Sequence, residues 1–505
     1  MKTQLRTALA PLCILALITI GVAGCGNTNA GTSTGAAVSG NQQASIQAQD
    51  STEDLEASTK EGQQTFRFDT FGDERFWGDT LKLHLAIEGR NLGGVGNGVS
   101  PKTALDIGLK VDADALPSSL VSQLQQGTVD LNDPATTLAL LKLNAVVGVT
   151  GIFNDNGTLK SIGIHCALCH STVDNSLTAG IGRRLDGWAN RDLNVGAIIA
   201  LAPDLSAIVS DLRVVDGSID AATVRKVLNS WGPGKFDAQL LLDGKAFRPD
   251  GKPAATLIPN AFGMQGFNMH TWTADWGSVP YWNAFVAIVE MGGVGNFFDP
   301  RLDDPQQFPD IAPRFPIAVA KKKGHIMVDP DSDRVTGKLA GLHLYQLSLF
   351  SPEPQPGTHF NSDAAKRGDD LFSGKAKCAT CHVEPLWTEP GWNAHRPEDI
   401  GIDNFQSERS PGRAYKTMNL AGLFIRELGI NMKPENKGRF YHDGRFATLL
   451  DVVNHYNSVL GLGLSDQEKS DLVEYLKALK TNGSSIEEET SNNQTSSSQT
   501  STSQS

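Results

Sequence analysis

The sequence has no excess of basic residues. Its 44 Lys and Arg are outnumbered by 56 Asp and Glu, which gives a formal net charge of -12. Contacts to nucleic-acid phosphates need clustered Lys and Arg, so this balance argues against a nucleic-acid partner. An acidic surface suits a partner with a basic docking face, but net charge alone does not identify that partner.

The N-terminus lacks a run long enough to span a membrane comfortably, and it has the layout of an export signal. Lys2 and Arg6 precede an apolar stretch at 9–22, which small residues follow. Val22-Ala-Gly-Cys25 then resembles a bacterial lipobox, which implies cleavage before Cys25 and a lipid on its sulfur. An ordinary signal peptide with a chance cysteine is the alternative.

The lipobox predicts a lipoprotein of the cell envelope, facing the periplasm or the exterior. Gly26 follows the lipidated cysteine where an Asp could stand, and this favours the outer membrane. The predicted signal peptide covers 1–24.

Composition divides the remainder of the chain. Residues 25–64 are rich in Gly, Ser, Thr, Ala and Gln, which predicts a flexible tether. Residues 482–505 form a Ser, Thr, Gln and Asn run that cannot bury a core, so we expect a disordered tail. Between them we predict two folded regions, an N-terminal one over 65–355 and a C-terminal domain over 356–481.

Cysteine is scarce, and none is left for a structural disulfide. Of 6 cysteines, Cys13 lies in the predicted signal peptide and Cys25 takes the lipid. The other four form two CxxCH motifs, Cys166-Ala-Leu-Cys169-His170 and Cys378-Ala-Thr-Cys381-His382. The missing disulfide is informative because an exported protein could form one.

The CxxCH spacing has a mechanical basis in haem attachment. Two thiols three residues apart reach the two vinyl groups on one porphyrin edge, and the following His is placed to bind the iron. A redox CxxC pair would need a thioredoxin-like strand and helix, which the surrounding sequence does not show. A zinc site would need thiolates to converge from distant segments. Two such motifs in an exported chain therefore predict two covalent haem c groups.

The spacing of apolar residues along the chain predicts a mainly α fold with one short β-hairpin. Residues 66–149 have helical spacing, and 146–164 alternate as a β-hairpin around the Asn-Asp-Asn-Gly turn at 154–157. Its second strand leads into the first CxxCH motif. From His170 to about 350 we expect several short helices.

The second motif lies in a helical frame. Residues 363–372 form an amphipathic helix before it, and Ser465-Asp-Gln-Glu468 is a capping box that begins a closing helix. This arrangement resembles a class I cytochrome c domain, so we predict two cytochrome c-like haem domains in tandem.

Gly438-Arg-Phe-Tyr-His442-Asp-Gly-Arg445, continuing to Val453, closely resembles the C-terminal signature of bacterial diheme cytochrome c peroxidases. Tyr415-Lys-Thr417 fits the same superfamily, whose members include the diheme enzyme of methylamine utilisation and the diheme rubber oxygenases. The layout looks most similar to the last group. The resemblance is specific over 364–480 and only topological over 165–295.

The resemblance implies that His170 and His382 are proximal iron ligands. One haem would be six-coordinate and pass electrons, and the other would react with peroxide or oxygen. The Met that binds the C-terminal haem of the peroxidases falls at Tyr456, which follows His455. Adjacent helical residues point about 100° apart, so only one of the two can face the iron.

We predict His455 as this ligand, because imidazole is the commoner haem ligand. The alternatives are Tyr456, Met418 and Met432. A His or Tyr ligand would give a lower potential than a Met.

The sequence says less about the distal side of the first haem, opposite His170. His270 could bind the iron, or the site could be open, as a reactive haem requires. Glu290 is the predicted distal acid, with Asp275 as the alternative.

Superfamily members also place a Trp between the haems. We predict Trp276 for this position, with Trp272 and Trp282 as alternatives. Packing against a porphyrin face would equally explain all three residues. The peroxidases hold a Ca²⁺ between domains, for which Asn194 and Thr417 are candidate ligands.

Three functions fit these features. The first is electron transfer by a membrane-tethered diheme cytochrome. The second adds peroxide reduction at the first haem, with electrons from a small periplasmic electron-transfer protein. The third is an oxygenase or oxidase of an organic substrate. We predict electron transfer with a peroxidase-like redox activity, because electron transfer is common to all three.

Overall fold

A computed structural model describes residues 40–266 and 268–484. The chain divides into two compact units, Met1–Glu53 and Asp54–Ser505, and the second of them contains both CxxCH motifs. The predicted signal peptide, Cys25 and the first part of the predicted tether lie outside the described residues. Within the described residues, no helix combines the length and the apolar character that a membrane crossing needs.

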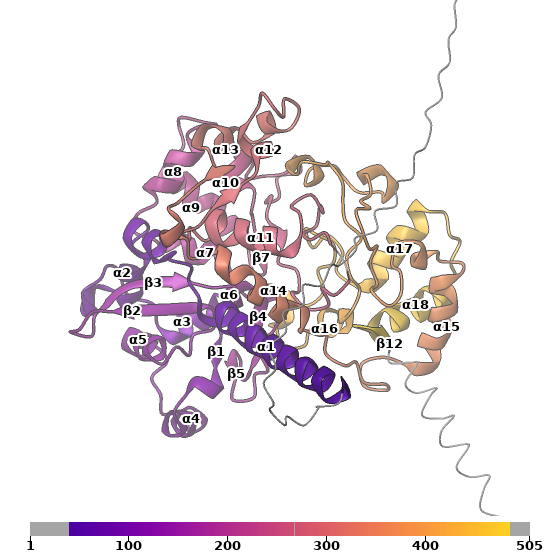
Figure 1. The fold of residues 1–505 in the computed structure, drawn as a ribbon, viewed down its shortest axis with the longest axis horizontal. Helices are drawn as coiled ribbons and strands as arrows, with labels where there is room; N and C mark the ends of the chain where they lie inside the picture. Colours follow the sequence, from indigo (N-terminus) through magenta and orange to yellow (C-terminus); the bar gives the residue numbers. More distant parts are fainter. Residues whose placement is uncertain (1–39, 267, 485–505) are drawn as a thin grey trace, which may run out of the picture. The chain divides into compact units, whose positions relative to one another are not determined.

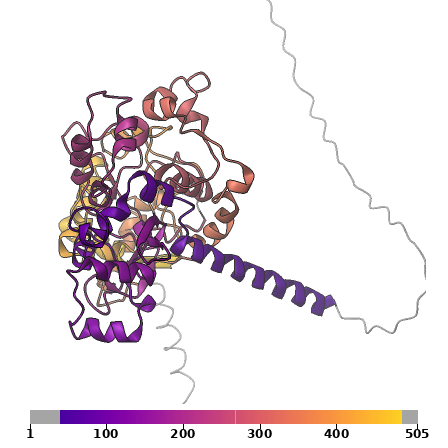
Figure 2. The ribbon, with the colours of Figure 1, turned by 90° about the vertical axis from the view of Figure 1, so that its left-hand side faces the viewer.

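The second part of the predicted tether is not flexible chain but helix. Helix α1 (Gly40–Phe68) is uninterrupted and includes 40–64 (Figure 2). Its Gln, Glu, Ala and Lys residues favour a helix, and its C-terminal end has a packing partner. Phe66 is fully buried and makes an edge-to-face contact with Tyr345, with ring centroids 5.5 Å apart. The prediction from composition missed this apolar anchor.

The predicted helical segment and hairpin that precede the first motif are confirmed. Strands β2 (Val149–Phe153) and β3 (Leu159–Ile164) are antiparallel, and Gly157 takes a φ of 83° in the turn. Strand β3 ends two residues before Cys166, and α6 (Ala167–His170) carries the rest of the motif. The helices that precede the hairpin are α2 (Leu83–Glu88), α3 (Pro101–Asp106), α4 (Ser118–Gln125) and α5 (Pro134–Lys142).

Short helices follow the first motif, as predicted. They are α7 (Val195–Ala200), α8 (Ser206–Leu212), α9 (Ala221–Ser230), α10 (Leu240–Asp243), α11 (Val279–Phe285), α12 (Pro300–Asp303), α13 (Pro316–Lys321) and α14 (Leu339–Leu347). Strands in the described residues occur only as two-stranded pairs, so the fold is mainly α (Figure 1). The remaining pairs are β1 (Val111–Asp112) with β5 (Ile181–Gly182), β4 (Ser171–Val173) with β6 (Arg184–Asp186), β7 (Lys235–Phe236) with β8 (Thr256–Leu257), β9 (Phe297–Phe298) with β10 (His325–Ile326), and β11 (Leu479–Lys480) with β12 (Gly483–Ser484).

The helical frame around the second motif is confirmed. It consists of α15 (Ser362–Ser373), α16 (Leu423–Leu428), α17 (Leu449–Val459) and α18 (Asp466–Ala478). The capping box predicted at Ser465 and Glu468 begins α18. Helices α15 and α18 cross so closely that a Cβ on Gly368 would lie 2.2 Å from the Asp471 carbonyl oxygen. A glycine is therefore required at this crossing.

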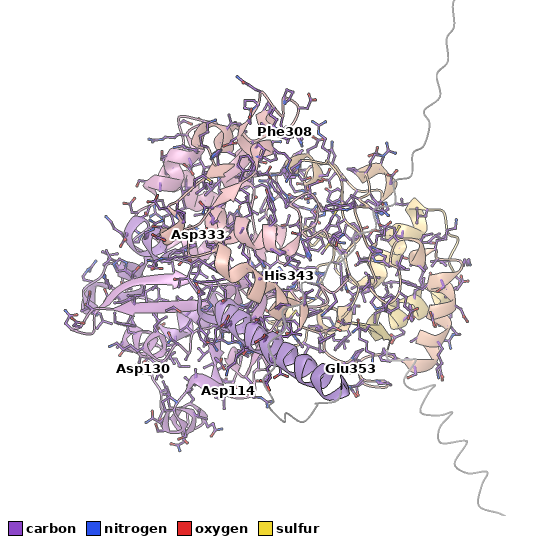
Figure 3. The ribbon with its side chains drawn as sticks, in the orientation of Figure 1. Asp114, Asp130, Phe308, Asp333, His343 and Glu353 are labelled. Carbon is purple, nitrogen blue, oxygen red and sulfur yellow. The ribbon has the colours of Figure 1, made fainter. Side chains whose placement is uncertain are left out.

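Hydrogen bonds and an ion pair connect the segment between α14 and α15 to the end of the C-terminal domain. Ser351 and Thr481 exchange hydrogen bonds between backbone N–H and side-chain hydroxyl, at 2.9 and 2.8 Å. Glu353, labelled in Figure 3, forms a 2.5 Å ion pair with Lys480 of β11. Strand β12 follows, so ordered chain extends to Ser484, slightly beyond the predicted start of the tail.

A buried ion cluster joins the region of the first motif to the region of the second. The Arg409 guanidinium donates to Asp243 at 2.7 Å and to Asp237 at 2.8 Å, and all three side chains are essentially inaccessible. Gln406 and Gln239 form a buried hydrogen bond beside it, at 3.2 Å. Because a buried charge is costly without its partner, these contacts fix how the two regions meet.

Replacing Arg409 with Met should lower the free energy of unfolding of the haem-loaded protein by about 3–5 kcal/mol, because two buried carboxylates lose their partner. Urea denaturation measures the loss. Arg413→Met is the matched control, since its ion pair with Glu408 is largely exposed and such pairs contribute at most about 1 kcal/mol. Equal losses in the two variants would contradict the assigned role.

Candidate haem-binding site

The two CxxCH motifs open onto one cavity. It has a volume of about 1000 Å³, and its walls include the cysteines and the histidine of both motifs. Most of the other lining residues are apolar, as a porphyrin face requires. Two segments from opposite ends of the folded unit thus share a single interior space.

His170 is held in the orientation of a metal ligand. Its Nδ1 lies 3.1 Å from the Pro259 carbonyl oxygen. A carbonyl only accepts, so Nδ1 carries the proton and Nε2 keeps its lone pair. Burial lowers the pKa of His170 to about 4, which keeps the ring neutral. A neutral imidazole fixed through its other nitrogen is the usual form of a metal-binding His.

His382 has the same arrangement in the second motif. Its Nδ1 donates to the Trp387 carbonyl oxygen at 2.9 Å, and burial lowers its pKa to about 4. The indole of Trp387 is itself anchored, because its Nε1 donates to the Lys480 carbonyl oxygen at 2.8 Å. Both histidines therefore present Nε2 in the way that an axial iron ligand must.

The donor set fits a covalently bound haem at each motif. The four motif cysteines are free of disulfide bonds and line the cavity. Buried polar atoms without a hydrogen-bond partner in the described part of the chain also lie in its walls, among them Glu290 Oε1 and the terminal nitrogens of Arg191. Such atoms call for a polar ligand group, so an apolar guest alone would leave them unsatisfied.

The geometry does not favour His455 as the iron ligand, and this assignment stays a prediction. Its Nε2 lies 2.8 Å from the Ile400 carbonyl oxygen, and His455 is not among the cavity residues. Tyr456 takes the inward direction on α17, lines the cavity, and interacts electrostatically with Cys378 and Cys381. One helical step of about 100° separates the two side chains, which accounts for their different directions.

Glu290, the predicted distal acid, lines the cavity near Cys169. It ends a short π-helical turn, η4 (Val286–Glu290), that continues α11, and its side chain enters the cavity near Cys169. Burial and the neighbouring Asp237 raise its pKa to about 8. Asp275, the alternative, does not line the cavity and accepts a hydrogen bond from Ser410 at 2.9 Å. Glu290 is therefore the carboxyl group available to a ligand at the first motif.

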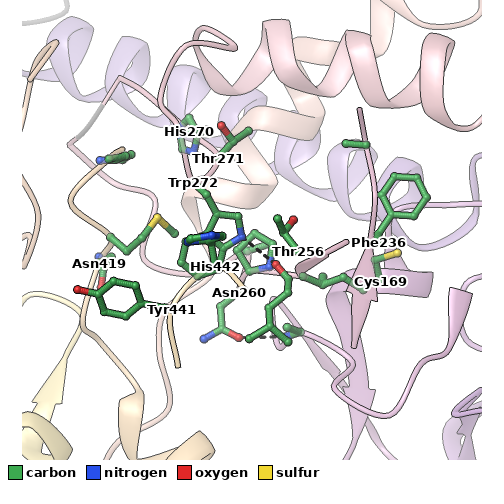
Figure 4. A pocket seen from close by; sticks show the side chains of 18 of the residues that line it. Cys169, Phe236, Thr256, Asn260, His270, Thr271, Trp272, Asn419, Tyr441 and His442 are labelled. Carbon is green, nitrogen blue, oxygen red and sulfur yellow. Dashed lines mark hydrogen bonds between the residues drawn. The ribbon is translucent and has the colours of Figure 1, made fainter. Parts of the chain in front are cut away.

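Trp276, the residue predicted to lie between the haems, is not among the cavity residues, and its role stays a prediction. Trp276 is buried among Trp282, Phe285 and Phe315 and does not line the cavity. Trp272 does line it, beside His442, with ring centroids 6.4 Å apart. In Figure 4 these two rings lie between Cys169 on one side and Tyr441 on the other.

His442 has no role predicted from the sequence beyond its place in the signature. Its ring stacks on Tyr415, with centroids 5.1 Å apart. The Leu257 N–H donates to its carbonyl oxygen at 2.6 Å, which ties the signature to β8. Only its position in the motif could have marked it.

The other candidate ligands stay open. His270, Met418 and Met432 all line the cavity. Asn194 accepts a hydrogen bond from Ala197 N–H at 3.1 Å at the start of α7, and Thr417 donates to Glu389 at 2.5 Å. Asn194 and Thr417 each have a local partner, and calcium binding stays a prediction.

Comparison with known proteins agrees with the sequence signature. No family model matches the chain. Cytochrome-c peroxidase IdrP1 of Denitromonas iodatirespirans is 27% identical over 307 residues, which cover 52% of this chain and 77% of that protein. Methylamine utilization protein MauG of Methylorubrum extorquens is 29% identical over 138 residues, 24% of this chain and 36% of MauG.

Hydrazine synthase subunit gamma of Kuenenia stuttgartiensis is 27% identical over 151 residues, 23% of this chain and 41% of that subunit. The match thus spans less than half of the second and third relatives. Among solved structures, a MauG-like protein associated with microbial copper homeostasis has a TM-score of 0.27 and 18% identity, over 50% of this chain and 80% of that one. The sequence homologues support the diheme cytochrome c peroxidase superfamily.

Replacing Tyr456 with Phe should change the absorption spectrum of one ferric haem, because the cavity loses the hydroxyl that faces it from α17. His455→Gln is the matched control on the neighbouring position, and its spectrum should equal that of the unmodified protein. A changed spectrum for His455→Gln with none for Tyr456→Phe would restore His455 as the ligand.

Proposed function

With homologues among the cytochrome-c peroxidases and MauG, we propose that this chain is a diheme haem oxidoreductase that reduces peroxide. Two cytochrome c-like domains in tandem would each carry one covalent haem c. The single observation that carries this proposal is the shared cavity, whose walls include both CxxCH motifs with His170 and His382.

The two ends of the cavity differ in their chemistry. The end at Cys169 contains Glu290, an acid that has no hydrogen-bond partner for Oε1 in the described residues. The end at Cys378 and Cys381 contains the phenol of Tyr456, whose pKa is raised by burial. We assign peroxide reduction to the first end and electron entry to the second. A Tyr in place of the Met gives the haem at the second motif a low reduction potential.

Reduction of H₂O₂ to two water molecules consumes two electrons and two protons. The haem iron supplies the electron exchange when it is bound. Glu290, protonated at neutral pH, donates a proton to the departing oxygen and so avoids release of hydroxide into a buried site. Trp272 and His442, which lie between Cys169 and Tyr441 in Figure 4, would provide an aromatic path for the electrons.

We infer the cellular location from the N-terminal lipobox and the kind of electron donor from the net charge. A lipid on Cys25 would tether the protein to a membrane of the cell envelope, with the outer membrane favoured. The electrons would come from a small periplasmic electron-transfer protein, and the net charge of -12 favours a donor with a basic face. Oxidation of an organic substrate is the alternative use of an open first site.

The spectrum of the purified holoprotein tests the proposed function. We expect two haems per chain, CO binding by one reduced haem, and peroxide turnover with a reduced donor. Absence of CO binding would leave only electron transfer. Oxygen uptake with an organic substrate, in place of peroxide turnover, would favour the oxygenase.

Replacing Glu290 with Gln should lower peroxide turnover by about 10²–10⁴-fold, the usual contribution of a positioned acid. The acid form exists below its pKa of about 8, so turnover of the unmodified protein should fall as pH rises through that value. The variant should lose this limb of the pH profile. Glu435→Gln, on an exposed residue, is the control. An unchanged limb in Glu290→Gln would exclude Glu290 as the titrating acid.

A further inference from the structure

Three arginines from separate segments meet at the wall of the cavity. Arg191 follows the first motif in sequence and is only 3% exposed. Arg426 lies on α16, and Arg439 lies in the C-terminal signature. Arg191 and Arg426 line the cavity, and all three are close enough to repel one another electrostatically. No motif recognised in the sequence includes Arg191 or Arg426.

Several donors of this cluster are left without a hydrogen bond by the described residues. Nη1 and Nη2 of Arg191 are both buried without a hydrogen-bond partner in the described part of the chain. Arg439 donates to the carbonyl oxygens of Pro233 at 2.8 Å and of Arg191 at 3.2 Å, while its Nε is likewise unsatisfied. Arg426 lies over the ring of Phe440, 5.1 Å from the centroid.

The carboxylate of Asp192, which lies near the cluster, already has other partners. Asp192 forms a buried ion pair with Lys110 at 2.6 Å. It also accepts from the backbone of Lys433 at 2.9 Å and from the amide of Asn436 at 2.7 Å. A buried ion without a partner costs several kcal/mol, so the cluster needs an anion that the described chain does not supply. Burial and mutual repulsion lower the pKa of Arg426 to about 10, in agreement with this need.

We propose that Arg191 and Arg426, with Arg191 positioned by Arg439, bind the propionate carboxylates of a haem in the cavity. The inference rests on the proposed function, because the propionates are the anions that haem brings into the protein. A guanidinium pairs with a carboxylate through two parallel N–H···O bonds, and Arg191 has both terminal nitrogens available.

The cluster contacts both ends of the cavity, so the propionates could come from either haem. Arg191 lies beside the first motif, since the Asn190 N–H donates to the Cys169 carbonyl oxygen at 2.9 Å. Arg426 lies beside Phe440, in the core of the C-terminal domain. In either case the guanidinium charge would hold the carboxylates ionised in a buried site and would influence the potential of that haem.

The holoprotein variants Arg191→Met and Arg426→Met test the proposal, with Arg191→Lys and Arg426→Lys as conservative partners. The matched control is Arg225→Met, because Arg225 donates to the carbonyl oxygens of Ala200 and Ala202 away from the cavity. Haem content per chain, the potential of each haem, and the propionate bands in the resonance Raman spectrum are measured.

The Met variants should keep two haems, shift the propionate bands of one haem and lower its potential, and the Lys variants should partly restore both. The haem whose signals move identifies the source of the propionates. Potentials and propionate bands unchanged in both Met variants would overturn the proposal. If Arg191→Met fails to mature, Arg426→Met and the Lys variants still decide the question. Absence of haem from the unmodified protein would instead refute the proposed function itself.

Discussion

The guanidinium of Arg409 lies fully buried between Asp237 and Asp243, and the shared cavity depends on this contact. The first CxxCH motif and the second are far apart in the chain, and each region has its own apolar core. Two apolar surfaces pressed together could slide, whereas a buried ion cluster has one geometry that satisfies its charges. The cluster therefore fixes the register of the two halves of the cavity wall.

Around this fixed interface, each proximal histidine is oriented by a backbone carbonyl rather than by another side chain. Pro259 holds His170 and Trp387 holds His382. A carbonyl cannot take up a proton at ordinary pH, so it defines the tautomer over the whole working range. The fold itself thus sets the tautomer of both rings, with Nε2 as the unprotonated nitrogen.

The features that the sequence predicts are those with local causes. The CxxCH residues follow from the chemistry of attachment, the hairpin from its Asn-Gly turn, and α18 from its capping box. The distal residues depend instead on how helices are rotated against the cavity. His455 and Tyr456 differ by one helical step, and of the two only Tyr456 lines the cavity. Trp272 and Trp282 line it, whereas Trp276 does not. Arg191 has no sequence signal, since it approaches Arg426 and Arg439 only where the two regions meet.

Electrostatics in the cavity connects these observations. Burial raises the pKa of Glu290 and lowers that of Arg426, so each group is driven toward its neutral form. For Glu290 the neutral form is useful, because it can donate a proton to a ligand at the first motif. For the arginines the neutral form is far less accessible, since a guanidinium stays protonated even when it is buried. The described residues leave this positive charge without a full set of partners, and we infer that the carboxylates of a haem are best stabilised on the side of the cavity that bears it.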